Sequence, residues 1–303
     1  ELVDATVDEV KDAKAYTTGT ISGALKNTQN TVALLKGLPT GDTLKATLAV
    51  TASIDATAEK QLNAAEIITI NGLTSGKITL GSQVTKITGS GADVAKVFSD
   101  SAAGVQLAGL KGTETVTILG GGISVADLNT TAPLAGKITG AVSDNDIATL
   151  EGITGTGNAL TIVVKDSVVD VTKLAAIAAK TTETLTVDST TITGKLADIN
   201  TAIASTSFTG VKDNNVIVTD AITSKQQKAL DAANNGVITA TISDNYLDQL
   251  LDTSNGITHS NSHNHKLSIT VKGDDSTKPT VRTVDAAKLV TLESGLDANT
   301  ILT

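Results

Sequence analysis

The stretch that decides the fold is residues 138–150, ITGAVSDNDIATL, which returns at residues 238–250 as ITATISDNYLDQL. Six of the thirteen positions are identical, and two more exchange Val for Ile or Ile for Leu. The copies lie 100 residues apart, because the first begins at Ile138 and the second at Ile238. Self-similarity at a fixed period is typical of stacked modules, so the sequence predicts a repeat array rather than a globular enzyme.

The similarity extends beyond this stretch in both directions. Residues 116–150 align with residues 216–250 at the same spacing. Further along, residues 267–272 (LSITVK) match residues 160–165 (LTIVVK), now 107 positions apart, because a polar loop is inserted between the two stretches. We therefore expect one continuous array over residues 1–303, with a partial unit at 1–46, units at 47–159 and 160–266, and a partial unit at 267–303.

One unit contains alternating strand and short-helix patterns, which we call coils: a strand together with the helix that follows it. Strands are predicted at 160–164, at 184–187 running on to 192, at 216–218 and at 237–242. Helices are predicted at 171–179, 196–203, 224–233 and 243–251. Strand, short helix, strand is the order that parallel pairing requires. Gly236, near the end of the third helix, is predicted to adopt the left-handed conformation that closes many helices.

The predicted fold class is an α/β repeat solenoid. Coils of about 25 residues would stack to form one parallel sheet with the helices along the other side. A parallel β-helix with few helices is the alternative. The only aromatic residues are Tyr16, Phe98, Phe208 and Tyr246, so a thin core of aliphatic side chains is expected.

The charge and composition exclude several classes of partner. The formal net charge is −9, and Arg282 is the only arginine, which argues against binding to nucleic acid or to an anionic membrane surface. No run of 18 apolar residues occurs, so no segment is predicted to span a membrane. The chain has no cysteine, which excludes disulfides and thiolate metal sites.

The three histidines, His259, His263 and His265, gather in the inserted polar loop. Imidazole suits zinc, nickel or copper, so the cluster is a candidate metal site. The alternative is an ordinary polar loop at the corner of a coil, because a structural metal site needs fixed geometry and usually a fourth ligand.

Asp144, Asp146 and Asp244 are candidate calcium ligands, since they lie in the two Ser-Asp-Asn stretches of the repeat. These stretches do not fit the EF-hand loop, which needs a central Gly and a distal Glu. Helix N-capping explains the same residues. We therefore expect no cofactor, with calcium as the alternative.

No pattern of catalytic residues emerges. Residues 155–157, Gly-Thr-Gly, invite a phosphate-loop interpretation, but they precede a strand and not a helix, so no helix N-terminus would face an anion. The chain has no cysteine nucleophile, and no histidine lies outside the inserted loop to act as a base. We therefore do not expect an enzyme.

A family resemblance rests on residues 192–202, 216–222 and 236–245. These stretches resemble the degenerate repeats of very large marine cyanobacterial extracellular proteins, and they are also similar to repeats of cyanophage structural proteins. The resemblance covers most of residues 45–300. It implies a surface or appendage role and carries over no catalytic residue.

The leading hypothesis is a non-catalytic structural and interaction protein at the cell surface. It would be a rigid solenoid segment of a cell-surface layer, an adhesin or an extracellular filament. Both ends of the chain fall inside units, so self-association into a filament or array is expected, with a carbohydrate or another cell-surface ligand as a further partner. The alternatives are a phage fibre subunit and, in another class, a carbohydrate-active enzyme on a solenoid scaffold.

Overall fold

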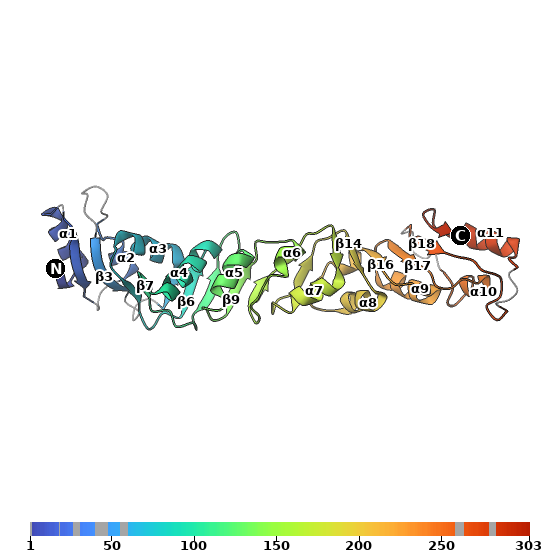
Figure 1. Ribbon diagram of the computed structural model, residues 1–303, viewed down its shortest axis with the longest axis horizontal. Coiled ribbons are helices and arrows are strands. Elements are labelled where there is room, and N and C mark those ends of the chain that lie inside the picture. Colours follow the sequence, from blue (N-terminus) through green and yellow to red (C-terminus); the bar gives the residue numbers. More distant parts are fainter. Residues whose placement is uncertain are drawn as a thin grey trace. The chain divides into compact units, whose positions relative to one another are not determined.

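A computed structural model describes residues 2–17, 19–26, 31–39, 60–257, 264–278 and 283–303, together with the backbone of 48–54. The chain is α/β, and it divides into two compact units. Unit 1 comprises residues 1–144, 152–161 and 180–182, and unit 2 comprises residues 145–151, 162–179 and 183–303. Figure 1 labels many of the helices and some of the strands of both units along the chain.

Unit 1 contains two five-stranded sheets and a row of helices. The first sheet has the order β1 (Leu2–Ala5), β2 (Ile21–Leu25), β3 (Leu48–Ile54), β5 (Ile78–Leu80), β7 (Leu107–Ala108). The second has the order β10 (Ala159–Thr161), β9 (Ile138–Ala141), β8 (Thr115–Ile118), β6 (Lys86–Gly89), β4 (Gln61–Asn63). The helices are α1 (Val7–Ala15), α2 (Val32–Leu35), α3 (Ala64–Leu73), α4 (Gly91–Ala103) and α5 (Val125–Thr131). Helices α3, α4 and α5 lie side by side along this unit (Figure 1).

Unit 2 follows the same plan. Its three-stranded sheet has the order β11 (Val163–Val164), β13 (Leu185–Val187), β15 (Phe208–Thr209). Its six-stranded sheet has the order β12 (Val168–Asp170), β14 (Thr191–Gly194), β16 (Asn215–Val218), β17 (Ile238–Thr241), β18 (Lys266–Ile269), β19 (Ile301–Leu302). The α-helices are α6 (Ile147–Leu150), α7 (Val171–Ala178), α8 (Leu196–Ala204), α9 (Ser224–Ala233), α10 (Leu247–Leu250) and α11 (Ala286–Ser294), and a 3₁₀ turn, η1, spans Val211–Asp213.

The pairings between strands of the described residues are parallel, as predicted. The expectation of one sheet is wrong, because the strands form four sheets. The reason is visible at residues 184–192, predicted as one strand. The chain there forms β13 in one sheet and β14 in another, with the polar residues 188–190 between them. Polar residues of this kind favour turns over continuous strands.

Both units bury the same register positions. In unit 1 the partners along β4, β6, β8 and β9 are Leu62, Ile87, Val116 and Ile138, each at most 2% exposed. In unit 2 the partners along β12, β14, β16 and β17 are Val169, Ile192, Val216 and Ile238, each 0% exposed. Full burial of such a side chain contributes about 1.5–3 kcal/mol. This aliphatic ladder therefore supplies a thin core without aromatic bulk.

The helices begin where short polar side chains can accept hydrogen bonds from the first turn. In the described parts of the chain, nine α-helices have such a cap: Thr6, Thr31, Asn63, Ser90, Ser124, Asp146, Asp170, Thr223 and Asp285. Lys195 and Tyr246, at the starts of α8 and α10, make no side-chain cap. Among the described residues, none of the helices has the length and apolarity that crossing a bilayer requires.

The predicted left-handed conformation of Gly236 is wrong. Gly236 does not have a left-handed conformation. A Cβ atom added to it would lie 2.2 Å from the carbonyl oxygen of Asn214. The position is glycine because the backbone passes directly against the neighbouring coil. At Gly136 in unit 1 an added Cβ would also be too close to the backbone, at 2.8 Å from the Thr113 carbonyl oxygen.

Candidate functional site

Asp144 and Asp244 each hold the beginning of a helix in the preceding coil. The Asp144 carboxylate accepts the backbone N–H of Val125, the first residue of α5, at 2.7 Å. The Asp244 carboxylate accepts the N–H of Ser224, the first residue of α9, also at 2.7 Å. The first N–H groups of a helix have no partner within the helix and carry partial positive charge, so a carboxylate there stabilises the helix end. We call this contact a helix clamp.

Two further helix clamps were not predicted from the sequence. Asp166 accepts the N–H of Ile147 in α6 at 2.7 Å, and Asp220 accepts the N–H of Leu196 in α8 at 2.9 Å. Asp220 thus supports a helix that lacks its own side-chain cap. The signal available in the sequence is an Asp just past the strand of the next coil.

Asp146 has a different role from its neighbour in sequence. It is the N-cap of α6, and its carboxylate accepts the N–H of Thr149 at 2.9 Å. That backbone hydrogen bond is the main reason why the pKa of Asp146 lies below its ordinary value. The three candidate calcium ligands therefore each support a separate helix start. Among the described residues, no group of three or more His, Cys, Asp or Glu side chains could hold a metal ion.

The histidine cluster is only partly within the described residues. His259 and His263 lie outside them. His265 is 3% exposed and lies just before β18. Its Nδ1 accepts the backbone N–H of Ile238 at 3.0 Å, and its Nε2 lies 2.8 Å from Oδ1 of Asp231 on α9.

These contacts assign the ring tautomer of His265. Because Nδ1 accepts a hydrogen bond from Ile238, the ring proton lies on Nε2 and is donated to the Asp231 carboxylate. Both ring nitrogens are thus used inside unit 2. A metal ion could bind either nitrogen only by replacing one of these hydrogen bonds.

A small hollow of about 390 Å³ lies beside the start of α9. It is lined by Thr223, Lys225, Asp244, Asp248, Gln249, Asp252 and Asn255. Its carboxylates already accept hydrogen bonds from the protein: Asp248 from Ser276, and Asp252 from the backbone of Ser254 and Asn255. Those backbone bonds to Asp252, with Asn255 the larger contribution, hold its pKa below the ordinary value. The hollow is therefore built of helix-end and turn contacts.

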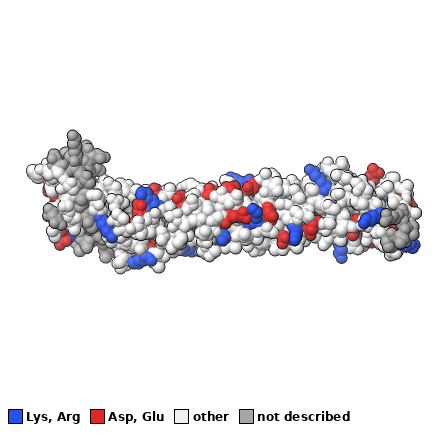
Figure 2. All heavy atoms as spheres, in the orientation of Figure 1, with Lys and Arg blue, Asp and Glu red and all other residues white. Residues whose placement is uncertain are grey.

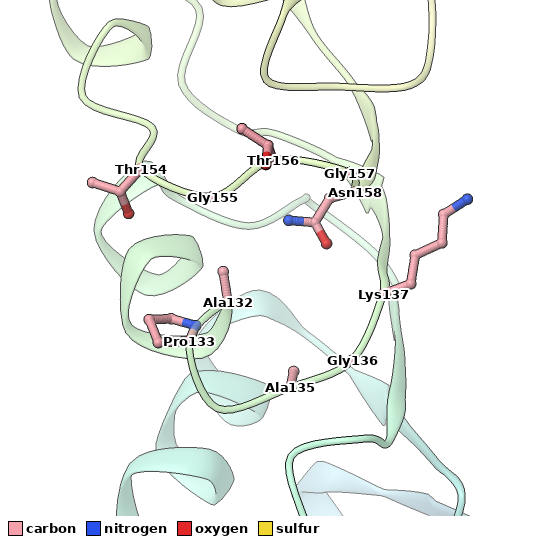
Figure 3. A pocket seen from close by; sticks show the side chains of 10 residues that line it. All are labelled: Ala132, Pro133, Ala135, Gly136, Lys137, Thr154, Gly155, Thr156, Gly157 and Asn158. Atoms are coloured by element: carbon pink, nitrogen blue, oxygen red, sulfur yellow. The ribbon is translucent and has the colours of Figure 1, made fainter.

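A larger groove of about 550 Å³ lies in unit 1 (Figure 3). It is lined by residues 132–133, 135–137 and 154–158, which place small side chains and backbone around one amide, Asn158. The side-chain oxygen of Asn158, Oδ1, accepts the backbone N–H of Ile138 at 2.8 Å. The NH₂ group of the same side chain points into the groove (Figure 3). The lining contains no carboxylate and no imidazole, and the side chain of Lys137, its one charged residue, points away from the groove (Figure 3).

The glycine-rich stretch at 155–157 forms one wall of this groove. Helix α5 ends at Thr131, so its C-terminus reaches the groove at Ala132 and Pro133. A helix C-terminus carries partial negative charge, so it disfavours an anion. On the face shown in Figure 2, acidic and basic side chains are interspersed. A phosphate loop is therefore not favoured by the surroundings of Gly155 and Gly157.

The common element of these sites is support between neighbouring coils. Carboxylates hold helix starts, and Asn158 and His265 hold strand N–H groups in equivalent positions of the two units. Comparison of the chain with protein families, with curated proteins and with solved structures finds no match.

Proposed function

We propose that the chain is a non-catalytic structural and interaction protein, a rigid solenoid segment of a cell-surface layer, an adhesin or an extracellular filament. The observation that carries this proposal is the aliphatic ladder, with the same register in both units. A coil in such a stack buries its apolar face only against its neighbours. The sequence units at 47–159 and 160–266 are part of the proposal.

The helix clamps add support for rigidity. Each joins two coils through a charge-assisted hydrogen bond, at Asp144, Asp166, Asp220 and Asp244. Bonds to an ionised partner are stronger than neutral ones. An array used for mechanical or spacing purposes benefits from contacts that fix the register of each coil on the next. The resemblance to marine cyanobacterial extracellular repeats points to the same class of role.

The test is to image the purified chain by cryo-electron microscopy and to measure its association by analytical ultracentrifugation. We expect elongated particles with a regular repeat and association that grows with protein concentration. A compact, non-repetitive particle that stays monomeric over the whole concentration range would contradict the proposal. Turnover of any member of a polysaccharide panel would favour the rival enzyme class instead.

A further inference from the structure

The fourth residue of most helices in this protein is a buried aliphatic residue that faces the core. In nine of the described helices this residue is Val, Leu or Ile and at most 1% exposed: Val10, Leu35, Ile67, Val94, Leu128, Leu150, Leu174, Ile199 and Leu250. In α11 it is Leu289, which is half-buried. This pattern reflects the burial of one helix face against the sheets.

Helix α9 is the exception. Its fourth residue is Gln227 and its first is Ser224, and both are 0% exposed. Neither nitrogen nor oxygen of the Gln227 amide has a hydrogen-bond partner among the described protein groups, nor has the Ser224 hydroxyl. Leaving one buried polar group unpaired costs about 1–3 kcal/mol of stability. We therefore expect these three atoms, on one helix face, to form hydrogen bonds with a molecule other than the protein.

The positions of these atoms indicate what the partner is. Residues three apart on a helix lie on the same face, so the Ser224 hydroxyl and the Gln227 amide are neighbours. Together they present a donor, an acceptor and a hydroxyl that can do either. The two side chains are neutral, which suits an uncharged guest better than an ion. A buried water makes about three hydrogen bonds in proteins, which fits this set.

We propose that α9 is seated on an internal hydration site, in which at least one water molecule bonds the Gln227 amide and the Ser224 hydroxyl. The site explains why the core pattern is interrupted at this one helix. Water replaces the aliphatic contact that the fourth residue makes elsewhere. Asp231, one turn further along α9, is buried against His265 and extends the polar interior of unit 2.

A crystal structure at high resolution tests the site directly. We expect density for a water molecule within hydrogen-bonding distance of the Gln227 amide and the Ser224 hydroxyl. A dry interior in which the Gln227 amide bonds a protein group, or turns out into solvent, would overturn the proposal.

Thermal unfolding of variants provides a second readout. Gln227→Leu restores the pattern of the other helices; we expect an unchanged midpoint or a small fall, because the variant removes hydrogen bonds that water was satisfying. A rise of several degrees in the midpoint of thermal unfolding would show that the amide had been unpaired, and it would overturn the proposal. Gln227→Met serves if the branched side chain does not fit. Leu174→Gln, at the same position of α7, is the matched control and should lower the midpoint strongly.

Discussion

Asn158 in unit 1 and His265 in unit 2 perform the same task with different chemistry. Each accepts the N–H at the start of a buried strand, Ile138 at 2.8 Å and Ile238 at 3.0 Å. Asn158 leaves its NH₂ group facing an open groove, whereas His265 donates its second nitrogen to the buried carboxylate of Asp231. The strand N–H is therefore bound by an amide beside a groove in unit 1 and by a buried imidazole that donates to a carboxylate in unit 2.

The neighbouring helix accounts for the difference. α5 is 7 residues long and stops before Pro133, whereas α9 is 10 residues long and carries Asp231 in its last turn. At the position that corresponds to Asp231 in the 100-residue repeat, unit 1 has Thr131, whose hydroxyl donates to the Asp127 carbonyl oxygen within α5. Unit 2 thus has a carboxylate at this position that meets its strand acceptor, whereas unit 1 has a hydroxyl that bonds within its own helix.

The largest loss of stability is expected for His265→Ala. The change removes the acceptor of the Ile238 N–H and leaves the Asp231 carboxylate without its imidazole donor in the interior of unit 2. Breaking a buried pair of this kind costs about 3–5 kcal/mol. Urea unfolding should show this loss, and hydrogen exchange should show lower protection of the Ile238 amide.

His265→Asn is the matched variant, since it installs the acceptor that unit 1 uses. It should restore the protection of the Ile238 amide but not the whole stability. If His265→Ala lost less than about 1 kcal/mol, the pair would be incidental to the fold.

Asn158→Ala tests the simpler half of the comparison. The Ile138 N–H would be left buried without an acceptor, at a cost of about 1–3 kcal/mol. Asn158→Asp keeps an acceptor oxygen and should lose less. Urea unfolding of the two variants checks the order, and equal losses would mean that the groove packing, not the hydrogen bond, supports this strand.

The helix spans near this comparison could be predicted from the sequence, but their long-range partners could not. Residues 171–179 and 224–233 are predicted as helices, and the helices at Val171–Ala178 and Ser224–Ala233 confirm them. The clamps at Asp166 and Asp220 join residues 19 and 24 positions apart (166 − 147 and 220 − 196). An Asp just past a strand marks a candidate for such a contact, but the local pattern does not say which helix start it meets.

His265 shows the same limit from another side. Its place in an inserted polar loop indicated a candidate metal ligand, but the structure buries its ring against Asp231, 34 residues earlier. By contrast, the polar inner face of α9 can be recognised in the sequence once the pattern of the other helices is known. Gln227 is the fourth residue of α9, and the other helices have Val, Leu or Ile at that position.

The helix clamps offer a test in which the two units should agree. Asp144→Ala and Asp244→Ala each remove the carboxylate from a helix start with the same 2.7 Å geometry. We expect each to lower the free energy of unfolding by about 0.5–2 kcal/mol. Asp144→Asn and Asp244→Asn keep an acceptor and should lose less. A large loss in one unit and none in the other, measured by urea unfolding, would show that the contacts are not equivalent.

The smallest effect concerns the quoted repeat itself, in which Asp146 is replaced by Tyr246. Asp146 caps α6, but Tyr246 makes no side-chain cap on α10. Tyr246→Asp should therefore stabilise the protein by about 0.5–1 kcal/mol at neutral pH. The gain should depend on pH as the Asp146 cap does. The Thr149 N–H lowers the pKa of Asp146 in the folded protein, so the unfolded chain binds the proton more readily.

The contribution of such a cap is complete above the ordinary carboxyl pKa of about 3.9 and is lost as the pH falls through the lowered folded value. Thermal midpoints of Tyr246→Asp and the parent should therefore converge below about pH 3. Tyr246→Asn supplies a cap that does not titrate, and its gain should persist in acid. If Tyr246→Asp kept its full advantage at low pH, the stabilisation would come from removing the tyrosine rather than from a charged cap. The replacement of Asp146 by Tyr246 would then matter through packing.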